Sequence, residues 1–244
     1  LEGTLVYTAP AGKAAVYELV LLPRDGTSRR VAADMEGFFD LSPGEDRVVV
    51  VGADPTSERP MAVIEVATGL ETRIGDGADA SSLSWDSQGE RVYHLTEKAP
   101  RALRSVPSDR NGDAIEVLGS QLVSFGVAVD PQGGRLAIPR MDAGGGLRIG
   151  IMEIDLATDS TRWLVEPEGI NARPAFSPDG RLLSYRRLGQ DFRGPLQILD
   201  LVDGRSWTLP MDSDSYRWSA SGEAIEYVEG ESLMARPVDI RAGF

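Results

Sequence analysis

The chain has 244 residues, of which 41% are hydrophobic and 26% charged, a composition that is ordinary for a globular protein and argues against long disordered segments. Its formal net charge of −13 argues against nucleic acid or an anionic membrane surface as a partner, because both require clustered Lys and Arg. Cysteine is absent, which excludes disulfides and thiolate metal sites, and the sequence predicts neither a signal peptide nor a membrane span.

The predicted elements are short strands throughout, rich in β-branched and aromatic residues. The sequence predicts three strands first, at residues 4–8, 16–22 and 28–31. A four-strand pattern begins at Phe38. We name its strands a (ending at Leu41), b (47–51), c (62–66) and d (71–74). The pattern then recurs at 83–85, 91–95, 102–106 and 114–118; at 127–129, 135–138, 147–154 and 161–165; at 175–176, 182–186, 196–199 and 206–209; and, without strand d, at 216–218, 224–228 and 232–238.

A turn between strands a and b marks each repeat, as in FSPDGRLLSY from Phe176, where Pro fixes φ, Asp offers a side-chain acceptor and Gly permits positive φ. The related segments are LSPGEDRVVV, WDSQGERVYH, VDPQGGRLAI and WSASGEAIEY, and the first has one extra residue before its arginine. The anchor residues Leu41, Trp85, Val129, Phe176 and Trp218 stand 44, 44, 47 and 42 residues apart.

This period predicts an all-β, six-bladed β-propeller of four-stranded antiparallel blades, forming a single domain over residues 1–244. The first repeat lacks strand a and the last lacks strand d, so the end blades are incomplete. The predicted blades cover approximately residues 3–33, 34–75, 76–119, 120–167, 168–211 and 212–244.

The repeated (W/F)-S-P-D-G unit resembles the TolB-like, PD40 form of the WD40-like propeller repeat, and Phe176-Ser177-Pro178-Asp179-Gly180 matches it fully. The opening GTLVYTAP and the closing GESLMARPVDIRAGF resemble the ends of propeller domains fused behind bacterial serine/threonine kinases. These resemblances imply a scaffold for recognition of proteins or ligands, generally without catalysis.

The residues themselves also argue against an enzyme, and we predict no cofactor and no metal site. The one histidine, His94, falls at a strand-b register that Tyr185 and Tyr227 occupy in other repeats, which predicts a core position. No GxSxG, P-loop or HExxH motif occurs. The four tryptophans recur in strands a and d, where core packing is expected.

A candidate binding surface follows from the predicted topology. The d-to-a and b-to-c loops emerge at one end of the blades, and the d-to-a loops are rich in carboxylates, as at Asp34 and Glu36. A solvated rim is one interpretation; the other is recognition of a cation or a basic segment by converging carboxylates, with Arg173 near the start of a strand a. The predicted binding residues are Asp76, Asp79, Glu166, Glu168, Arg173, Asp212 and Asp214.

The sequence therefore predicts a recognition or sensor module that binds a protein, peptide or small ligand within a larger bacterial signalling protein. The alternatives are an accessory, gating propeller of a prolyl-oligopeptidase-like hydrolase, a TolB-like periplasmic scaffold, and a structural spacer or oligomerisation unit. The kinase-tail resemblance favours an extracytoplasmic position over a cytoplasmic one.

Overall fold

The computed structural model confirms the predicted all-β class, because the residues that it describes form strands and turns and contain no helix. The chain divides into two compact units, Leu1–Ser120 and Gln121–Phe244, each of which we describe by itself. The predicted single domain stays a prediction. The described residues are 5–10, 17–22, 29–52, 60–75, 78–98, 100–119, 122–123, 125–144, 146–211, 216–229 and 232–238.

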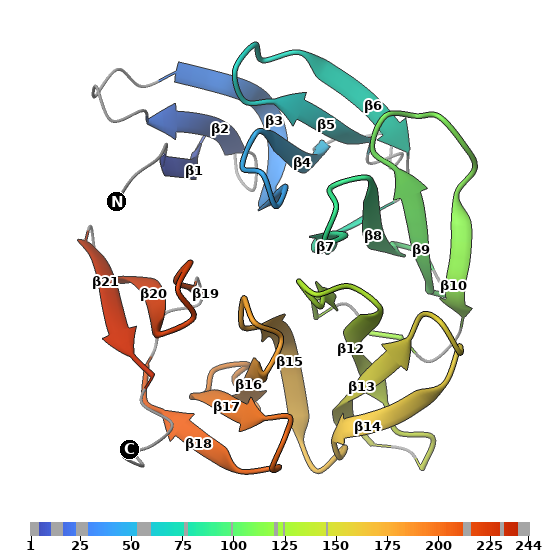
Figure 1. Cartoon of the computed structure of the whole chain (residues 1–244), viewed down its shortest axis with the longest axis vertical. Coiled ribbons are helices and arrows are strands. Elements are labelled where there is room, and N and C mark those ends of the chain that lie inside the picture. The colour runs from blue at the N-terminus through green and yellow to red at the C-terminus, as the bar shows by residue number, and fades with distance from the viewer. Residues whose placement is uncertain are drawn as a thin grey trace. The chain divides into compact units, whose positions relative to one another are not determined.

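The first unit contains two antiparallel sheets, drawn from blue to green in Figure 1. Six strands pair in chain order: β1 (Leu5–Pro10), β2 (Tyr17–Leu22), β3 (Arg29–Leu41), β4 (Arg47–Gly52), β5 (Met61–Glu65) and β6 (Glu71–Gly75). A four-stranded sheet follows, formed by β7 (Ala78–Trp85), β8 (Arg91–Thr96), β9 (Ala102–Pro107) and β10 (Ile115–Gly119).

Strand β3 corrects one expectation. It pairs with β2 through its first half and with β4 through its second half, so it serves as strand d of the first repeat and strand a of the second. Asp34 and Glu36 therefore lie within a continuous 13-residue strand and not in a d-to-a loop. Strand β7 likewise begins at Ala78, earlier than the predicted Leu83.

The second unit contains the remaining strands, drawn from yellow-green to red in Figure 1. Two four-stranded blades are joined by one parallel bridge, Ile149 to Ile170, and a three-stranded sheet follows. The strands are β11 (Ala128–Val129), β12 (Arg135–Met141), β13 (Ile149–Asp155) and β14 (Thr161–Val165); β15 (Ile170–Phe176), β16 (Leu182–Leu188), β17 (Leu196–Asp200) and β18 (Ser206–Leu209); and β19 (Tyr216–Trp218), β20 (Ala224–Glu229) and β21 (Ser232–Pro237).

The apolar cores lie between consecutive blades. Strand β4 is buried on both faces because β2 packs on one side and β7 and β8 pack on the other, which is why it carries four buried valines in succession. In the first unit, one core joins the buried residues of β4 and β5 to Trp85 and Val92. In the second, Ala137 and Ile151 meet Phe176 and Leu183. Strand d consists of exposed and half-buried residues in β6 and β10, as expected of an outer strand.

All five a-to-b turns have one geometry. The fourth turn residue donates its N–H to the carbonyl of the first, and the first donates to the residue five positions later. The turns are therefore equal in length, and the extra residue expected in the first copy is not present. The first copy differs because Glu45 occupies the positive-φ position that glycine holds in the other turns. Arg181 stands one position earlier in its turn than Arg47, Arg91 and Arg135 do in theirs. The fourth turn residues are Glu45, Gly89, Gly133, Gly180 and Gly222.

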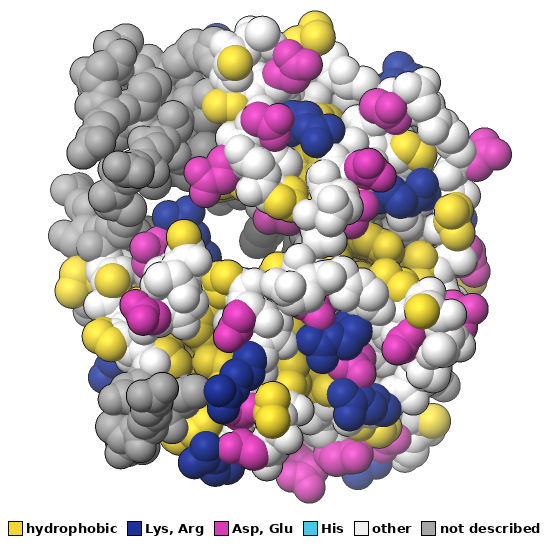
Figure 2. All heavy atoms as spheres, in the orientation of Figure 1, with side chains coloured by type: hydrophobic (Ala, Val, Ile, Leu, Met, Phe, Trp, Pro, Cys, Tyr) yellow, Lys and Arg dark blue, Asp and Glu magenta, His cyan; other side chains and the backbone are white. Residues whose placement is uncertain are grey.

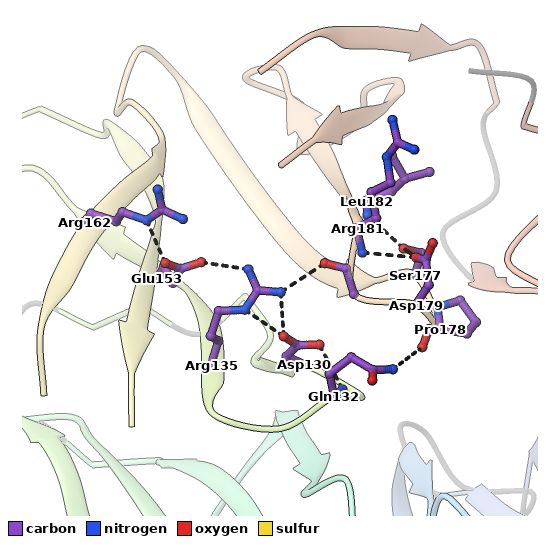
Figure 3. A network of polar contacts seen from close by, with 11 residues as sticks. Asp130, Gln132, Arg135, Glu153, Arg162, Ser177, Pro178, Asp179, Arg181 and Leu182 are labelled. Carbon is purple, nitrogen blue, oxygen red and sulfur yellow. Dashed lines mark hydrogen bonds and ion pairs between the residues drawn. The ribbon is translucent and has the colours of Figure 1, made fainter. Parts of the chain in front are cut away.

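An arginine at the start of strand b links one blade to the next. Arg135 donates to the carbonyl oxygen of Gly180 at 3.0 Å and lies over the ring of Phe176, while it also pairs with Asp130 and Glu153 (Figure 3). In the first unit Arg47 does the same, with a 2.8 Å bond to the Gly89 carbonyl and its guanidinium over Trp85. One pair of neighbouring turns in each unit is thereby fastened together.

Tryptophans at the end of strand a form a second link. The indole N–H of Trp85 donates to the Asp40 carbonyl at 3.1 Å, and that of Trp218 donates to the Ala175 carbonyl at 3.2 Å. Both rings are buried, which confirms the predicted core role of these two residues. Each link joins strand a of one blade to strand a of the next.

Candidate functional site

The predicted acidic residues are described only in part. Glu166 and Glu168 are exposed in the turn that follows β14, where the Glu168 N–H donates to the Glu166 carbonyl at 2.8 Å. Asp79 belongs to strand β7, so it does not lie in a loop, and its side chain is outside the described residues. Asp76, Asp212 and Asp214 also lie outside them. Whether these carboxylates converge stays a prediction.

The described part of the surface shows charges of both signs. On the face drawn in Figure 2, Asp and Glu side chains are interspersed with Lys and Arg. Among the described residues, no group of three or more His, Cys, Asp or Glu is placed to hold a metal ion.

Arg173 occupies an unusual backbone position. It lies at a bulge in β15, between Ala172 and Ala175, and its φ of 52° is in the left-handed region that non-glycine residues seldom adopt. Two hydrogen bonds of 2.6 Å hold it there: its N–H donates to the Phe125 carbonyl, and its carbonyl accepts from the Tyr216 hydroxyl. The arginine side chain is exposed. Strained backbone conformations that the surrounding structure fixes cluster at binding sites and active sites.

Two phenylalanines lie beside this bulge. The ring of Phe125, which precedes β11, stacks with Phe192 from the b-to-c loop between β16 and β17, with centroids 6.2 Å apart. Phe192 also has a positive φ, 59°, and 52% of its surface is exposed. Because Phe125 contacts both Arg173 and Phe192, the three residues are connected. We call Phe125, Arg173, Phe192 and Tyr216 the rim cluster.

Buried Arg186 fixes the loops around the rim cluster. Its Nη1 donates to the Met211 carbonyl at 2.8 Å, in the segment before β19, and to the Gly194 carbonyl in the b-to-c loop. Its guanidinium lies 5.7 Å from the centre of the Tyr216 ring. Burial raises the pKa of Tyr216 to about 12, so its hydroxyl keeps the proton that it donates to Arg173. The rim cluster thus rests on a loop arrangement held by charge-assisted hydrogen bonds.

His94 is a core residue, as predicted. It is 3% exposed, and its Nδ1 lies 3.3 Å from the Leu95 carbonyl. Burial lowers its pKa to about 4, so the ring is neutral at physiological pH.

Of the rim cluster, the sequence analysis found Arg173 alone. Phe125 and Phe192 fall in segments that break the repeat pattern, and an aromatic residue outside the repeat is a signal that the sequence does carry. Their contact could not be predicted, since they are 67 positions apart and belong to different blades.

Comparison with known proteins places the fold. TolB from Acinetobacter baumannii superposes with a TM-score of 0.78 at 18% identity, over 96% of this chain and 61% of that one. The chain has the fold of a TolB-like β-propeller. A chain in the crystal structure of a nidogen–laminin complex is similar with a TM-score of 0.70 at 15% identity, over 96% of this chain and 89% of that chain.

Sequence comparison adds less to the propeller assignment. The chain is 24% identical over 234 residues to a protein named phosphoglycerate kinase from Mycolicibacterium smegmatis, which covers 91% of this chain. It spans 57% of that relative and 61% of the TolB chain. No protein-family model matches the chain. Among its described residues, no helix is long and apolar enough to cross a membrane. The number of blades, six, stays a prediction.

Proposed function

We propose that the chain is a non-catalytic recognition module that binds a peptide or an exposed loop of a partner protein at the rim cluster. The observation that carries this proposal is Arg173, an exposed cation that two short hydrogen bonds lock in a strained backbone conformation beside the exposed Phe192 ring. Such a surface suits a ligand with a carboxylate for the arginine and an apolar group for the ring.

The propeller fold supports this function without specifying the partner. A propeller offers a rigid scaffold whose loops vary, and the fold alone does not fix the activity. A TolB-like scaffold role is compatible with the same surface. We further propose, from the resemblance of the chain ends to kinase-linked propellers, that the module belongs to a bacterial signalling protein and lies outside the cytoplasm.

A library of phage-displayed random peptides tests the proposal without a known partner. The immobilised chain should enrich peptides that carry a carboxylate and an apolar residue. Arg173→Ala and Phe192→Ala should each lower the affinity for the enriched peptides by about tenfold or more, which corresponds to roughly 1.4 kcal/mol of binding free energy. Arg110→Ala is the matched control, because Arg110 is also an exposed arginine with positive φ, 67°, but lies in the β9–β10 turn. Peptides that bind all four proteins equally would contradict the proposal.

The acidic residues form a second, weaker part of the proposal. We infer that Glu166 and Glu168, with Asp76, Asp79, Asp212 and Asp214, attract basic residues of the same ligand. Glu166→Gln with Glu168→Gln should raise the melting temperature at low salt and lower the affinity for a ligand that contains lysine. Salt should reduce both effects, since screening acts over about 8 Å at physiological ionic strength. No change in melting or in affinity at low salt would leave these residues as ordinary surface charge.

A further inference from the structure

The turn between β9 and β10 carries one of the two asparagines of the chain. Asn111 is followed by Gly112, whereas the other asparagine, Asn171, is followed by Ala172. Residues 109–114 of the turn are all exposed. The side-chain amide of Asn111 is therefore open to water and lies next to a main-chain nitrogen that no Cβ atom shields.

The nitrogen of Gly112 is held only weakly in the turn. Its N–H donates to the Arg110 carbonyl at 3.2 Å, a long hydrogen bond that spans a single intervening residue. The φ of Gly112, 136°, lies in the region that favours glycine. Small movements of this exposed turn can thus free the Gly112 nitrogen from its acceptor.

Asp109 binds the Asn111 amide from the other side. Its Oδ1 accepts the Asn111 main-chain N–H and its Oδ2 accepts from Nδ2 of the Asn111 side chain, both at 2.9 Å. These two hydrogen bonds lower the pKa of Asp109, so its carboxylate is ionised at neutral pH. The anion stabilises the positive charge that Nδ2 acquires when it departs from the side chain.

Asn171 has the opposite environment. It is 2% exposed within β15, where its Nδ2 donates to the Ile149 carbonyl at 2.8 Å. Ala172, which follows it, is fully buried and pairs with Arg186 of β16. The side chain of Asn171 reaches water and the next nitrogen only after this sheet opens, so Asn171 is an internal reference for Asn111.

We propose that Asn111 is a site of spontaneous deamidation. The Gly112 nitrogen loses its proton and attacks the side-chain carbonyl carbon of Asn111, the side-chain amide leaves as ammonia, and a five-membered imide closes. Water then opens the imide. Cleavage at the side-chain carbonyl gives an ordinary aspartate, and cleavage at the main-chain carbonyl gives an isoaspartyl residue, whose main chain is longer by one carbon.

The modification changes the charge and the hydrogen bonds of the turn. Either product adds one negative charge beside Asp109 and removes the Nδ2 donor that Asp109 now accepts from. Because ammonia is lost, the change is irreversible, and the modified fraction increases with the age of the chain.

Incubation of the purified chain followed by peptide mass spectrometry tests the proposal. The peptide that contains Asn111 should gain the mass of one amide-to-acid conversion about tenfold faster or more than the peptide that contains Asn171, which must first open locally. The rate should rise with pH, because the Gly112 nitrogen must lose its proton. Asn111→Gln is the matched control: it keeps the amide but would need a six-membered ring, so its peptide should stay unchanged over the same period.

The isoaspartyl product tests the route. Protein isoaspartyl methyltransferase, supplied with labelled S-adenosylmethionine, should label the aged chain and leave aged Asn111→Gln unlabelled. The proposal is overturned if Asn111 does not convert, or if Asn111 and Asn171 convert at the same rate. Conversion of Asn111 without an isoaspartyl product also overturns it, since direct hydrolysis by water forms no imide.

Discussion

Asp40 is a carboxylate buried at the interface between two blades. Its carboxylate accepts the Trp85 N–H and the Leu41 N–H, each at 3.1 Å, beside the apolar core shared by β4, β7 and β8. Burial raises the pKa of Asp40 from 3.8 to about 7. In the second unit the corresponding residue is Ala175, whose carbonyl accepts the Trp218 indole N–H and whose side chain carries no charge.

This pKa predicts a pH dependence of stability. The folded chain holds the Asp40 proton more tightly than the unfolded chain, so this stabilisation is complete below about pH 4 and is lost as the pH rises to about 7. Asp40→Asn should remove that loss. From pH 5 to pH 8, the free energy of unfolding of the unaltered chain, measured with urea, should fall relative to that of the variant by on the order of 2 kcal/mol. Parallel pH profiles would contradict the prediction.

Gly180 meets two separate constraints. Its φ is +69°, and a Cβ atom there would lie 2.5 Å from Asp130 Oδ1. That oxygen accepts the Gln132 N–H, and the other oxygen of the same carboxylate pairs with Arg135. Gly204 has φ +74° and no atom within 4 Å of a Cβ atom. Gly204→Ala should therefore cost about 1 kcal/mol for the backbone alone, and Gly180→Ala about 2 kcal/mol more for the contact between blades. Equal losses in denaturant unfolding would mean that the contact carries no energy.

At the scale of elements, the arginines that begin strand b differ in the partner groups that would lose a hydrogen bond or ion pair if each arginine were replaced. Arg135→Met would leave Asp130, which is 2% exposed at its side chain, without its cation, and we expect a loss of about 3 kcal/mol. Arg47 binds a carbonyl and the Ser108 hydroxyl, so Arg47→Met should cost about 1 kcal/mol. Thermal or urea unfolding of both variants measures the difference, and a larger loss for Arg47 would contradict this account of the links.

The strands could be predicted well from the sequence because the same pattern of strands and turns recurs in every repeat. The a-to-b turn and the core position of His94 both follow from residues within about ten positions of each other. The sequence analysis missed the continuous strand β3. The acidic side chains of Asp34 and Glu36 predict a loop, but hydrogen bonding to both β2 and β4 holds this segment as a strand.

At the scale of the whole molecule, the propeller fold was predictable and the candidate site was not. Arg173 could be named from its place before a strand a, but its left-handed backbone depends on Phe125 and Tyr216, which lie 48 and 43 residues away. The Phe125–Phe192 stack depends on the same packing of neighbouring blades. Contacts of this kind carry no local sequence pattern, whereas repeats do.

Hydrogen exchange with and without a peptide selected by display tests the central claim, recognition at the rim cluster, most directly. We expect slower exchange at residues 122–126, 170–175 and 189–194, which carry the rim cluster and its loops, and no change at the β15–β16 turn, residues 177–180. The same peptide should protect none of these segments in Arg173→Ala. Protection confined to the turns, or the same protection in Arg173→Ala, would contradict the claim.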